Sequence, residues 1–207
     1  MSRRPECPRC AGAVLPPSAF SSSWRCDRHG VVAPLHLFAS ASPEAIDMVR
    51  RLTHVPMWLP APMPVGWSVT GLGYAGDDRS GARATLVACS GPAPLGGPAD
   101  LLLVAEEPGV GLGAGYAGID GPDPGPQLEE QRAGIVRTQG HPTALWPISG
   151  VSDRCAVVGE AAGLWLWAIL WPAPAGYLLA EDLRLNDLRE GTPGDLPVGP
   201  TSPRLRR

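Results

Sequence analysis

Two pairs of metal-binding side chains near the N-terminus constrain the fold of this chain more than any other feature. Cys7 and Cys10 form the first pair and Cys26 and His29 the second, and two residues separate the members of each pair. Fifteen residues, 11–25, lie between the pairs. Two turns that each present two thiolate or imidazole ligands can surround one tetrahedral Zn²⁺ ion, and this spacing is that of a zinc ribbon. The sequence therefore predicts one zinc ion bound by Cys7, Cys10, Cys26 and His29.

A set of four protein ligands predicts a structural zinc site. Four ligands fill the coordination shell, so no position remains for a water molecule that could attack a substrate. Gly12 and Gly30 follow the two pairs, and we expect them to provide the positive φ of a tight turn around the metal. A disulfide or a thioredoxin-type redox pair is the alternative, but no βαβ pattern surrounds Cys7. A nucleobase-deaminase site would need a His-x-Glu triplet upstream of the cysteines, which the sequence lacks.

The first thirty residues are basic, with five arginines and two acidic residues. Three thiolates, a neutral imidazole and Zn²⁺ carry a net charge of about −1, and the arginines in or beside the ligand pairs would offset it. The alternative is a basic face for nucleic acid, formed by Arg3, Arg4, Arg9, Arg25 and Arg28. Residues 31–207 contain twelve arginines and eighteen acidic residues, so we do not expect them to bind polyanions.

The composition excludes several kinds of chemistry and indicates two folded units. No lysine occurs in the chain, which excludes a phosphate-loop lysine, a Schiff-base lysine and pyridoxal chemistry. With 207 residues and 21.6 kDa, the chain can form one medium domain and one small one. A ribbon of about thirty residues is too small to bury a core, so it would depend on its metal for folding.

We predict an α+β fold in which a small N-terminal zinc ribbon precedes a mainly antiparallel β-sheet domain with one linker helix. Ser42-Pro43-Glu44 predicts the start of that helix. Serine caps the first turn, and proline is tolerated at the first helical position because its missing N–H would have no partner there. The predicted units are the zinc ribbon (1–38), the linker helix with a proline-rich segment that packs on the sheet domain (42–65), the sheet domain (66–190) and a disordered tail (191–207).

Alternating apolar patterns and turn residues predict the strands of the larger domain. The segments are 67–75, 82–90, 101–106, 116–119, 135–138, 143–148, 155–160, 164–171 and 177–180. Residues 31–37 read as a strand that leaves the ribbon, and 182–189 as a strand or short helix. Segment 164–171 carries large apolar side chains at both odd and even positions, which point to opposite faces of a strand. We therefore expect it to be the central strand, covered on both faces.

Two motifs of the larger domain resemble ligand loops but lack their context. Residues 71–76 and 113–118 match Gly-x-Gly-x-x-Gly, yet turn residues follow each match where a dinucleotide site needs a helix. Residues 120–123 resemble part of a calcium loop without its further carboxylates, so a turn is the better interpretation. We therefore predict no nucleotide site at residues 71–76 or 113–118 and no calcium site at residues 120–123.

The remaining reactive side chains leave few catalytic possibilities. The adjacent acids Asp77-Asp78 and Glu106-Glu107 would point to opposite faces of a strand, and we expect them to face solvent. His36 is expected to be a packing or surface residue. Cys89 and Cys155 fall within apolar strands, where buried inert thiols are expected. The imidazoles open to general-base catalysis are His54 and His141, and a Cys89–His141 nucleophile pair stays an alternative.

Longer segments of the sequence resemble one family. They read Cys-Pro-x-Cys, Trp-x-Cys-Asp-x-His-Gly, Pro-Val-Gly-Trp67, Tyr-Ala-Gly-Asp-Asp-Arg-Ser-Gly81, Leu-Leu-Leu-Val-Ala-Glu-Glu107 and Gly-Leu-Trp-Leu-Trp-Ala-Ile169. Over most of residues 5–190 the chain resembles a family of actinobacterial proteins with an N-terminal zinc ribbon and no established activity. The order of its elements is also similar to that of sheet domains in anti-sigma-factor regulators and lipoprotein-sorting proteins, which implies a fold only.

We therefore predict a non-enzymatic cytoplasmic adaptor that binds a protein partner and has no membrane contact. No secretory signal follows Met1, and the longest apolar stretch, 164–171, is too short to span a bilayer. One alternative is a hydrolase or transferase with a site near Asp77, Asp78, Arg79, His141 or Cys89. Another is a ribbon that contacts nucleic acid or the transcription machinery. The aromatic face that packs the core and contributes to a partner groove would comprise Trp67, Trp146, Trp165, Trp167 and Trp171.

Overall fold

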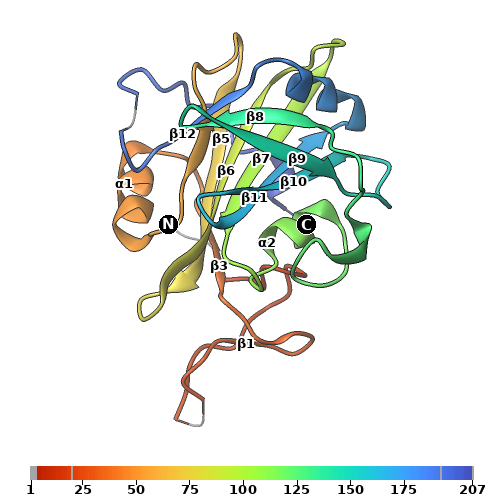
Figure 1. The fold of residues 1–207 in the computed structure, drawn as a ribbon. Coiled ribbons are helices and arrows are strands. Elements are labelled where there is room, and N and C mark those ends of the chain that lie inside the picture. Colours follow the sequence, from red (N-terminus) through yellow and green to blue (C-terminus); the bar gives the residue numbers. More distant parts are fainter. Residues whose placement is uncertain (1–3, 20, 192, 207) are drawn as a thin grey trace.

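The computed structural model describes residues 4–19, 21–191 and 193–206, and one open β-sheet dominates the fold (Figure 1). Among these residues, ten strands form the sheet in the order β3-β5-β6-β7-β11-β10-β9-β8-β12-β4. Neighbouring strands are antiparallel except β12 and β8, which are parallel. The strands are Leu35–Leu37 (β3), Trp58–Pro60 (β4), Ser68–Asp77 (β5), Gly81–Pro92 (β6), Pro98–Glu106 (β7), Gly134–Thr138 (β8), His141–Pro147 (β9), Cys155–Ala161 (β10), Leu164–Trp171 (β11) and Arg184–Asp187 (β12).

Strand β11 is the central strand that its sequence predicts. It lies between β7 and β10, and its side chains alternate between two hydrophobic cores. Leu166 and Leu170 face the first core, while Trp167 and Ile169 face the second. This position explains why both odd-numbered and even-numbered residues of β11 carry large apolar side chains, because neither face of the strand meets water.

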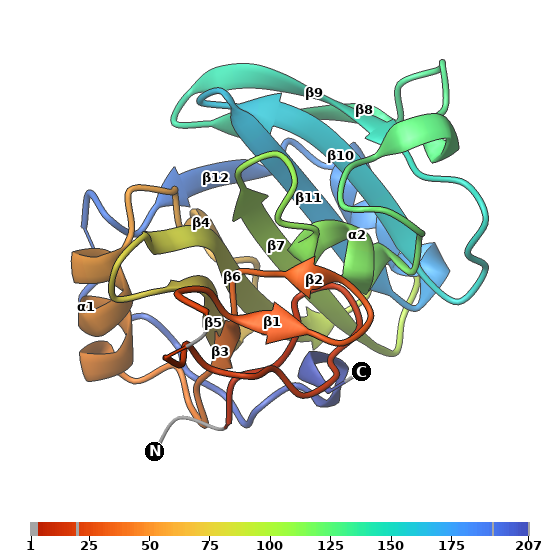
Figure 2. The same ribbon diagram turned by 90° about the horizontal axis from the view of Figure 1, so that it is seen from below.

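The first core lies inside a fold of the sheet. The second half of the sheet, from β9 to β4, turns back over the first half, so β4 contacts β6 and β7 (Figures 1 and 2). Helix α1, Pro43–Leu52, closes one side of this core. As predicted, Ser42 caps the helix and its hydroxyl accepts a hydrogen bond from Ala45 N–H at 3.3 Å. The proline-rich segment packs there too, and it provides β4, a strand that its prolines did not suggest.

The second core carries a short helix that the sequence analysis did not predict. Residues 116–119 were expected to form a strand, but Leu112–Ala117 form helix α2. Gly111 begins it with φ +82°, and the side chain of Glu106 accepts hydrogen bonds from the Leu112 and Gly113 N–H groups at 2.7 and 3.1 Å. A Cβ at Gly113 would lie 2.2 Å from Trp167 Cδ1, so only glycine lets the helix lie this close to β11. The chain thus has a second helix beside the one predicted.

Three other predicted elements differ in form. Residues 177–180 belong to a 3₁₀ helix, Ala173–Ala180 (η2). Two prolines near its start lack the N–H group that strand pairing needs, and they favour a turn instead. The strand expected over 31–37 is interrupted at Pro34, which separates β2 (Gly30–Val31) from β3. Residues 184–187 form the strand β12, where a strand or helix was expected. A further 3₁₀ turn, η1, spans Gly125–Gln127.

The tryptophans do not form a single aromatic face. Trp67 belongs to the first core, whereas Trp167 and Trp171 belong to the second. Trp165 packs at the edge of the second core and Trp146 is half-buried. The predicted face therefore loses Trp67, whereas Trp165, Trp167 and Trp171 have the same parity on β11 and lie on the side of the second core.

The C-terminal tail was expected to be disordered, but its described residues pack on the sheet. The N–H of Val69 donates to Pro197 O at 2.8 Å, and the N–H of Ser202 donates to Thr70 O at 2.8 Å. The tail ends in the 3₁₀ turn η3, Pro203–Leu205, whose Leu205 is only 2% exposed. Backbone pairing with β5 and the buried side chains of Ser202 and Leu205 hold a segment whose composition alone suggested disorder.

Substituting Gly71 by alanine should release this tail. A Cβ at Gly71 would lie 2.2 Å from Leu205 Cδ1, and displacing the leucine removes burial worth about 2 kcal/mol. We expect faster hydrogen exchange over 197–206 in Gly71→Ala, measured by mass spectrometry. Gly191→Ala is the control, since a Cβ there meets nothing within 4 Å. Unchanged exchange in Gly71→Ala would contradict this account of the tail.

Candidate metal centre

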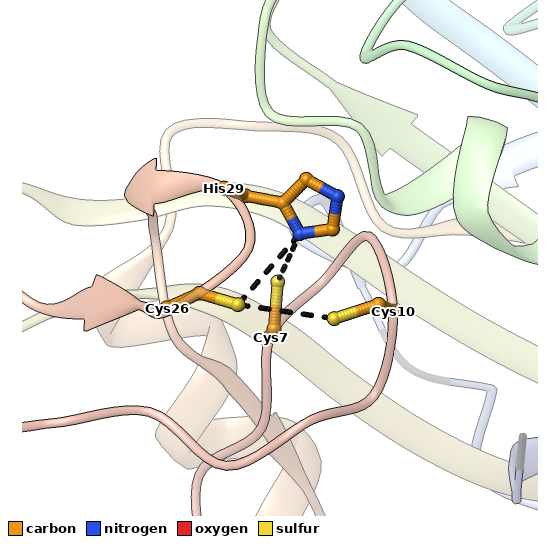
Figure 3. Close-up of side chains that lie close together, drawn as sticks. All are labelled: Cys7, Cys10, Cys26 and His29. Carbon is orange, nitrogen blue, oxygen red and sulfur yellow. Dashed lines mark hydrogen bonds between the residues drawn. The ribbon is translucent and has the colours of Figure 1, made fainter.

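The four predicted metal ligands lie together in the N-terminal lobe, which we define as residues 4–34. Their ligand atoms are all within 4.8 Å of one another (Figure 3). Nδ1 of His29 is 3.5 Å from Cys7 Sγ and 3.7 Å from Cys26 Sγ, and the Cys10 and Cys26 sulfurs are 3.8 Å apart. Figure 3 shows the three sulfurs and Nδ1 pointing toward a common centre.

These distances fit a tetrahedral ion. With zinc bonds of about 2.3 Å to sulfur and about 2.0–2.1 Å to nitrogen, a tetrahedron separates two sulfurs by about 3.8 Å and a sulfur from a nitrogen by about 3.6 Å. Three of the six separations, 3.8, 3.5 and 3.7 Å, match these values, and all six are within 4.8 Å. A disulfide needs sulfurs about 2.05 Å apart, and all five cysteines of the chain are free. The donor set therefore fits a metal ion better than a disulfide.

Each cysteine-led turn directs backbone N–H groups at its own sulfur. The N–H groups of Arg9 and Cys10 donate to Cys7, and those of Arg28 and His29 donate to Cys26. Gly30 has the expected positive φ, +68°. In the first turn, Ala11 and not Gly12 has the positive φ, +55°. A Cβ on Gly12 would lie 3.3 Å from Cys10 Sγ, so the role of this glycine is to leave space for the sulfur.

Burial and these hydrogen bonds act in opposite directions on the thiols. Burial raises the pKa of Cys7 to about 11, although its two N–H donors lower it. Burial also acts to raise the pKa of Cys26, but there the N–H groups of Arg28 and His29 help to hold the pKa below its usual value. Cys7 is 0% exposed and Cys26 4%, so a cation at the centre would meet thiolates shielded from water.

Apart from this cluster, little holds the lobe together. The hydrophobic cluster among its described residues consists of Cys7, Cys26 and Val32, with Cys10 and Val14 at its edge. A two-stranded ribbon, β1 (Arg25–Cys26) with β2 (Gly30–Val31), provides its regular structure. The lobe joins the sheet through paired hydrogen bonds between Glu6 and Leu35 at 3.0 and 2.7 Å. Two of its three core residues are thus also metal-ligand candidates.

The ribbon arginines do not share one face. Arg9 reaches across to the sheet, where its guanidinium donates to Gly109 O at 2.6 Å and Val110 O at 3.2 Å. Arg4, Arg25 and Arg28 are exposed, and Arg3 lies outside the described residues. The predicted basic face therefore lacks Arg9, which connects the lobe to the body of the protein.

Arg9→Gln should loosen the lobe without removing the metal ligands. The variant loses two charge-assisted hydrogen bonds, and we expect the free energy of unfolding to fall by about 1–2 kcal/mol in a denaturant titration. The exposed Arg28 provides the matched control, because Arg28→Gln should change stability by less than about 0.5 kcal/mol. Equal effects of the two substitutions would contradict the bridging role of Arg9.

The fold and the cluster together define a protein with a candidate Cys3His metal centre on a small lobe, attached to an open β-sheet. A model described as a family of unknown function, DUF6758, matches residues 1–205, and the chain belongs to this family. The match agrees with the resemblance to a family without established activity, and it specifies neither a source nor a metal. No curated protein matches the chain, and no solved structure does either.

The structure separates the predicted nucleophile pair. Cys89 is 0% exposed within β6, and burial raises its pKa to about 12. His141 is exposed at the start of β9, which is not a neighbour of β6. Cys155 is half-buried, and burial raises its pKa as well. Neither thiol is placed for nucleophilic chemistry, because the thiolate is the reactive form.

The adjacent acidic residues 106 and 107 were expected to face solvent, and the expectation is wrong for Glu106. Its side chain is 0% exposed, and burial raises its pKa to about 8 despite the N–H donors of α2. Glu107 points to the opposite side, where Arg83 Nε lies 2.6 Å and His54 Nε2 2.8 Å from its carboxylate. Opposite orientation was predicted correctly, but the helix that covers Glu106 was not.

The two glycine motifs and the acidic turn have structural roles. Residues 71–76 lie inside β5, and residues 113–118 lie within and just after α2, so neither forms the strand-to-helix turn of a dinucleotide site. Asp123 Oδ1 accepts hydrogen bonds from Gly109 N–H and Trp165 Nε1, both at 2.9 Å.

Within the described ranges, no helix is both long and apolar enough to cross a membrane.

Proposed function

We propose that Cys7, Cys10, Cys26 and His29 bind one structural Zn²⁺ ion, and that the lobe folded around it serves as an interaction module. The tetrahedral fit of the four ligand atoms carries the proposal. Three thiolates and one imidazole are donors that zinc prefers, and four protein ligands leave no open position for catalysis. Nδ1 of His29 is the ligand atom, so the ring proton would lie on Nε2.

The surface of the lobe supports the second part of the proposal. Leu15 is 62% exposed and Val31 59% exposed, and the exposed Arg25 is the cross-strand partner of both. In Figure 1 the lobe projects below the sheet. Apolar side chains flanked by arginine are typical of protein interfaces, so a regulatory or adaptor protein with an unidentified partner fits this arrangement best.

Cobalt substitution tests whether the site is closed. Co²⁺ replaces zinc without change of ligands, and its visible absorption distinguishes tetrahedral from six-coordinate geometry. We expect the intense absorption of a tetrahedral Co²⁺ site with thiolate ligands, unchanged by added azide, because no exchangeable position is present. His29→Ala should open one position and make the spectrum respond to azide. A weak six-coordinate spectrum in the unsubstituted protein would contradict a structural site.

A further inference from the structure

A row of aromatic rings connects the sheet to the lobe. His36 on β3 and Tyr74 on β5 are cross-strand partners, and their rings stack with centroids 4.7 Å apart and planes 13° apart. Phe38 continues the row on one side, with its centroid 6.2 Å from that of Tyr74. On the other side, Trp24 from the lobe forms a T-shaped pair with His36, with ring centroids 6.4 Å apart and planes at 85°.

These rings form a right-angled corner beside a cavity. Since Trp24 is perpendicular to His36 and Tyr74 is nearly parallel to it, the indole is close to perpendicular to the phenol ring. A cavity of 250 Å³ opens at this corner, and it is lined by Pro17, Trp24, His36, Tyr74, Asp77, Asp78 and Arg79. Drug-sized ligands occupy about 300–1,000 Å³, so this space fits one side chain rather than a cofactor.

The charges around the corner favour a cation. Asp77 ends β5 and Asp78 follows it in the turn to β6, and both raise the pKa of the Tyr74 phenol, after the larger effect of burial. The single lining arginine, Arg79, directs its guanidinium to Ser22 O at 3.4 Å. His36 adds no charge, because burial lowers its pKa and its Nε2–H donates to Gly76 O at 3.1 Å. Two carboxylates against one guanidinium leave a net negative cavity.

We propose that the corner formed by Trp24, His36 and Tyr74, with Asp77 and Asp78 at its rim, binds the ammonium group of a lysine side chain from a partner protein. Perpendicular aromatic faces surround a compact ammonium or methylammonium group, whereas a planar guanidinium stacks on a single face. The chain contains no lysine, so the group must come from another protein. The inference rests on the proposed function, because Trp24 is placed by the lobe.

The neighbouring cavity provides space for the peptide that would carry the lysine. It has a volume of 370 Å³, shares Trp24, Asp77 and Arg79 with the first, and continues between lobe and sheet as far as Arg83 and Val110. Ser80 adds a hydroxyl group along it, whereas both backbone groups of Gly109 already pair within the chain, with Arg9 and Asp123. A lysine in the corner would thus leave its flanking residues in an open groove between lobe and sheet.

Proton–nitrogen NMR spectra of the full zinc-loaded chain test this proposal. The probes are Nα-acetyl-lysine methylamide, its Nε-trimethyl form, the arginine analogue, the neutral norleucine analogue and tetramethylammonium chloride. We expect saturable shifts of the Trp24 indole and the Tyr74 amide with both lysine probes, with dissociation constants on the order of millimolar. The arginine analogue should bind more weakly, and norleucine should not bind.

Three variants localise the effect. Trp24→Leu should weaken lysine binding at least about tenfold, and Asp78→Asn about threefold. The exposed Asp120 lies outside the corner, and Asp120→Asn should leave binding unchanged. Absence of saturable shifts, shifts that survive both substitutions, or binding of tetramethylammonium without either lysine probe would overturn the proposal. Zinc content is measured on each sample: no binding with zinc retained contradicts this inference alone, whereas absence of zinc contradicts the proposed function.

Discussion

Removal of zinc is expected to unfold residues 4–34 and leave the sheet folded. Among the described residues of the lobe, the hydrophobic cluster consists of Cys7, Cys26 and Val32, so little apolar burial offsets the conformational entropy that the lobe loses on folding. Structural zinc sites provide about 10–16 kcal/mol of apparent binding free energy. Hydrogen exchange by mass spectrometry, before and after chelation, should show loss of protection confined to the lobe.

Cys26→Ser should reproduce the effect of the chelator, since serine is a poor zinc ligand. Cys155→Ser is the control, because this cysteine lies on β10, away from the cluster. The sheet has two cores of its own, so its protection should persist in all three samples. A lobe that keeps its protection without metal would contradict this account, and so would simultaneous unfolding of the sheet.

The second large effect concerns the buried carboxyl group of Glu106. Its pKa in the folded protein is about 8, against 4.5 for an ordinary glutamate. Between these values the unfolded chain has released the proton and the folded chain still holds it, so the free energy of unfolding falls as pH rises. The expected loss from pH 4.5 to pH 8 is on the order of 4 kcal/mol, and the loss is complete about one pH unit above the folded pKa. Urea titrations across this range measure it.

Glu106→Gln should abolish this pH dependence, because the amide does not titrate. Glu107→Gln is the matched control, since Glu107 pairs with Arg83 and His54 and its pKa is lowered rather than raised. Its contribution falls below pH 4.5, outside the tested range. Comparing the proteins at each pH cancels effects common to them, including release of metal at low pH. An unchanged slope in Glu106→Gln would show that this carboxyl group is not the cause.

Features determined by short-range chemistry could be predicted from the sequence. The ligand pattern Cys7-x-x-Cys10 and Cys26-x-x-His29 places two ligands in each turn, and the turns need only one hairpin to meet. The cap of α1 at Ser42 and the central position of β11 follow in the same way from local hydrogen bonding and side-chain parity. Each of these depends on residues close together in the chain.

Features that depend on distant partners could not be predicted. Glu106 is buried because α2 folds over it and presents two N–H groups, which composition alone does not indicate. The tail is ordered because Leu205 fits beside Gly71, more than a hundred residues earlier in the chain. The aromatic corner joins Trp24 to Tyr74 across the boundary between lobe and sheet, so no spacing in the sequence revealed it.

The central claim is that Cys7, Cys10, Cys26 and His29 hold one zinc ion. The most direct test is the metal content, by mass spectrometry, of protein purified without added metal, together with Cys26→Ser and His29→Ala. We expect one zinc ion per chain in the unsubstituted protein, loss of zinc in Cys26→Ser and weakened retention in His29→Ala. A protein without zinc, or zinc that both substitutions leave unchanged, would contradict the assignment and return Cys7 and Cys10 to consideration as redox groups.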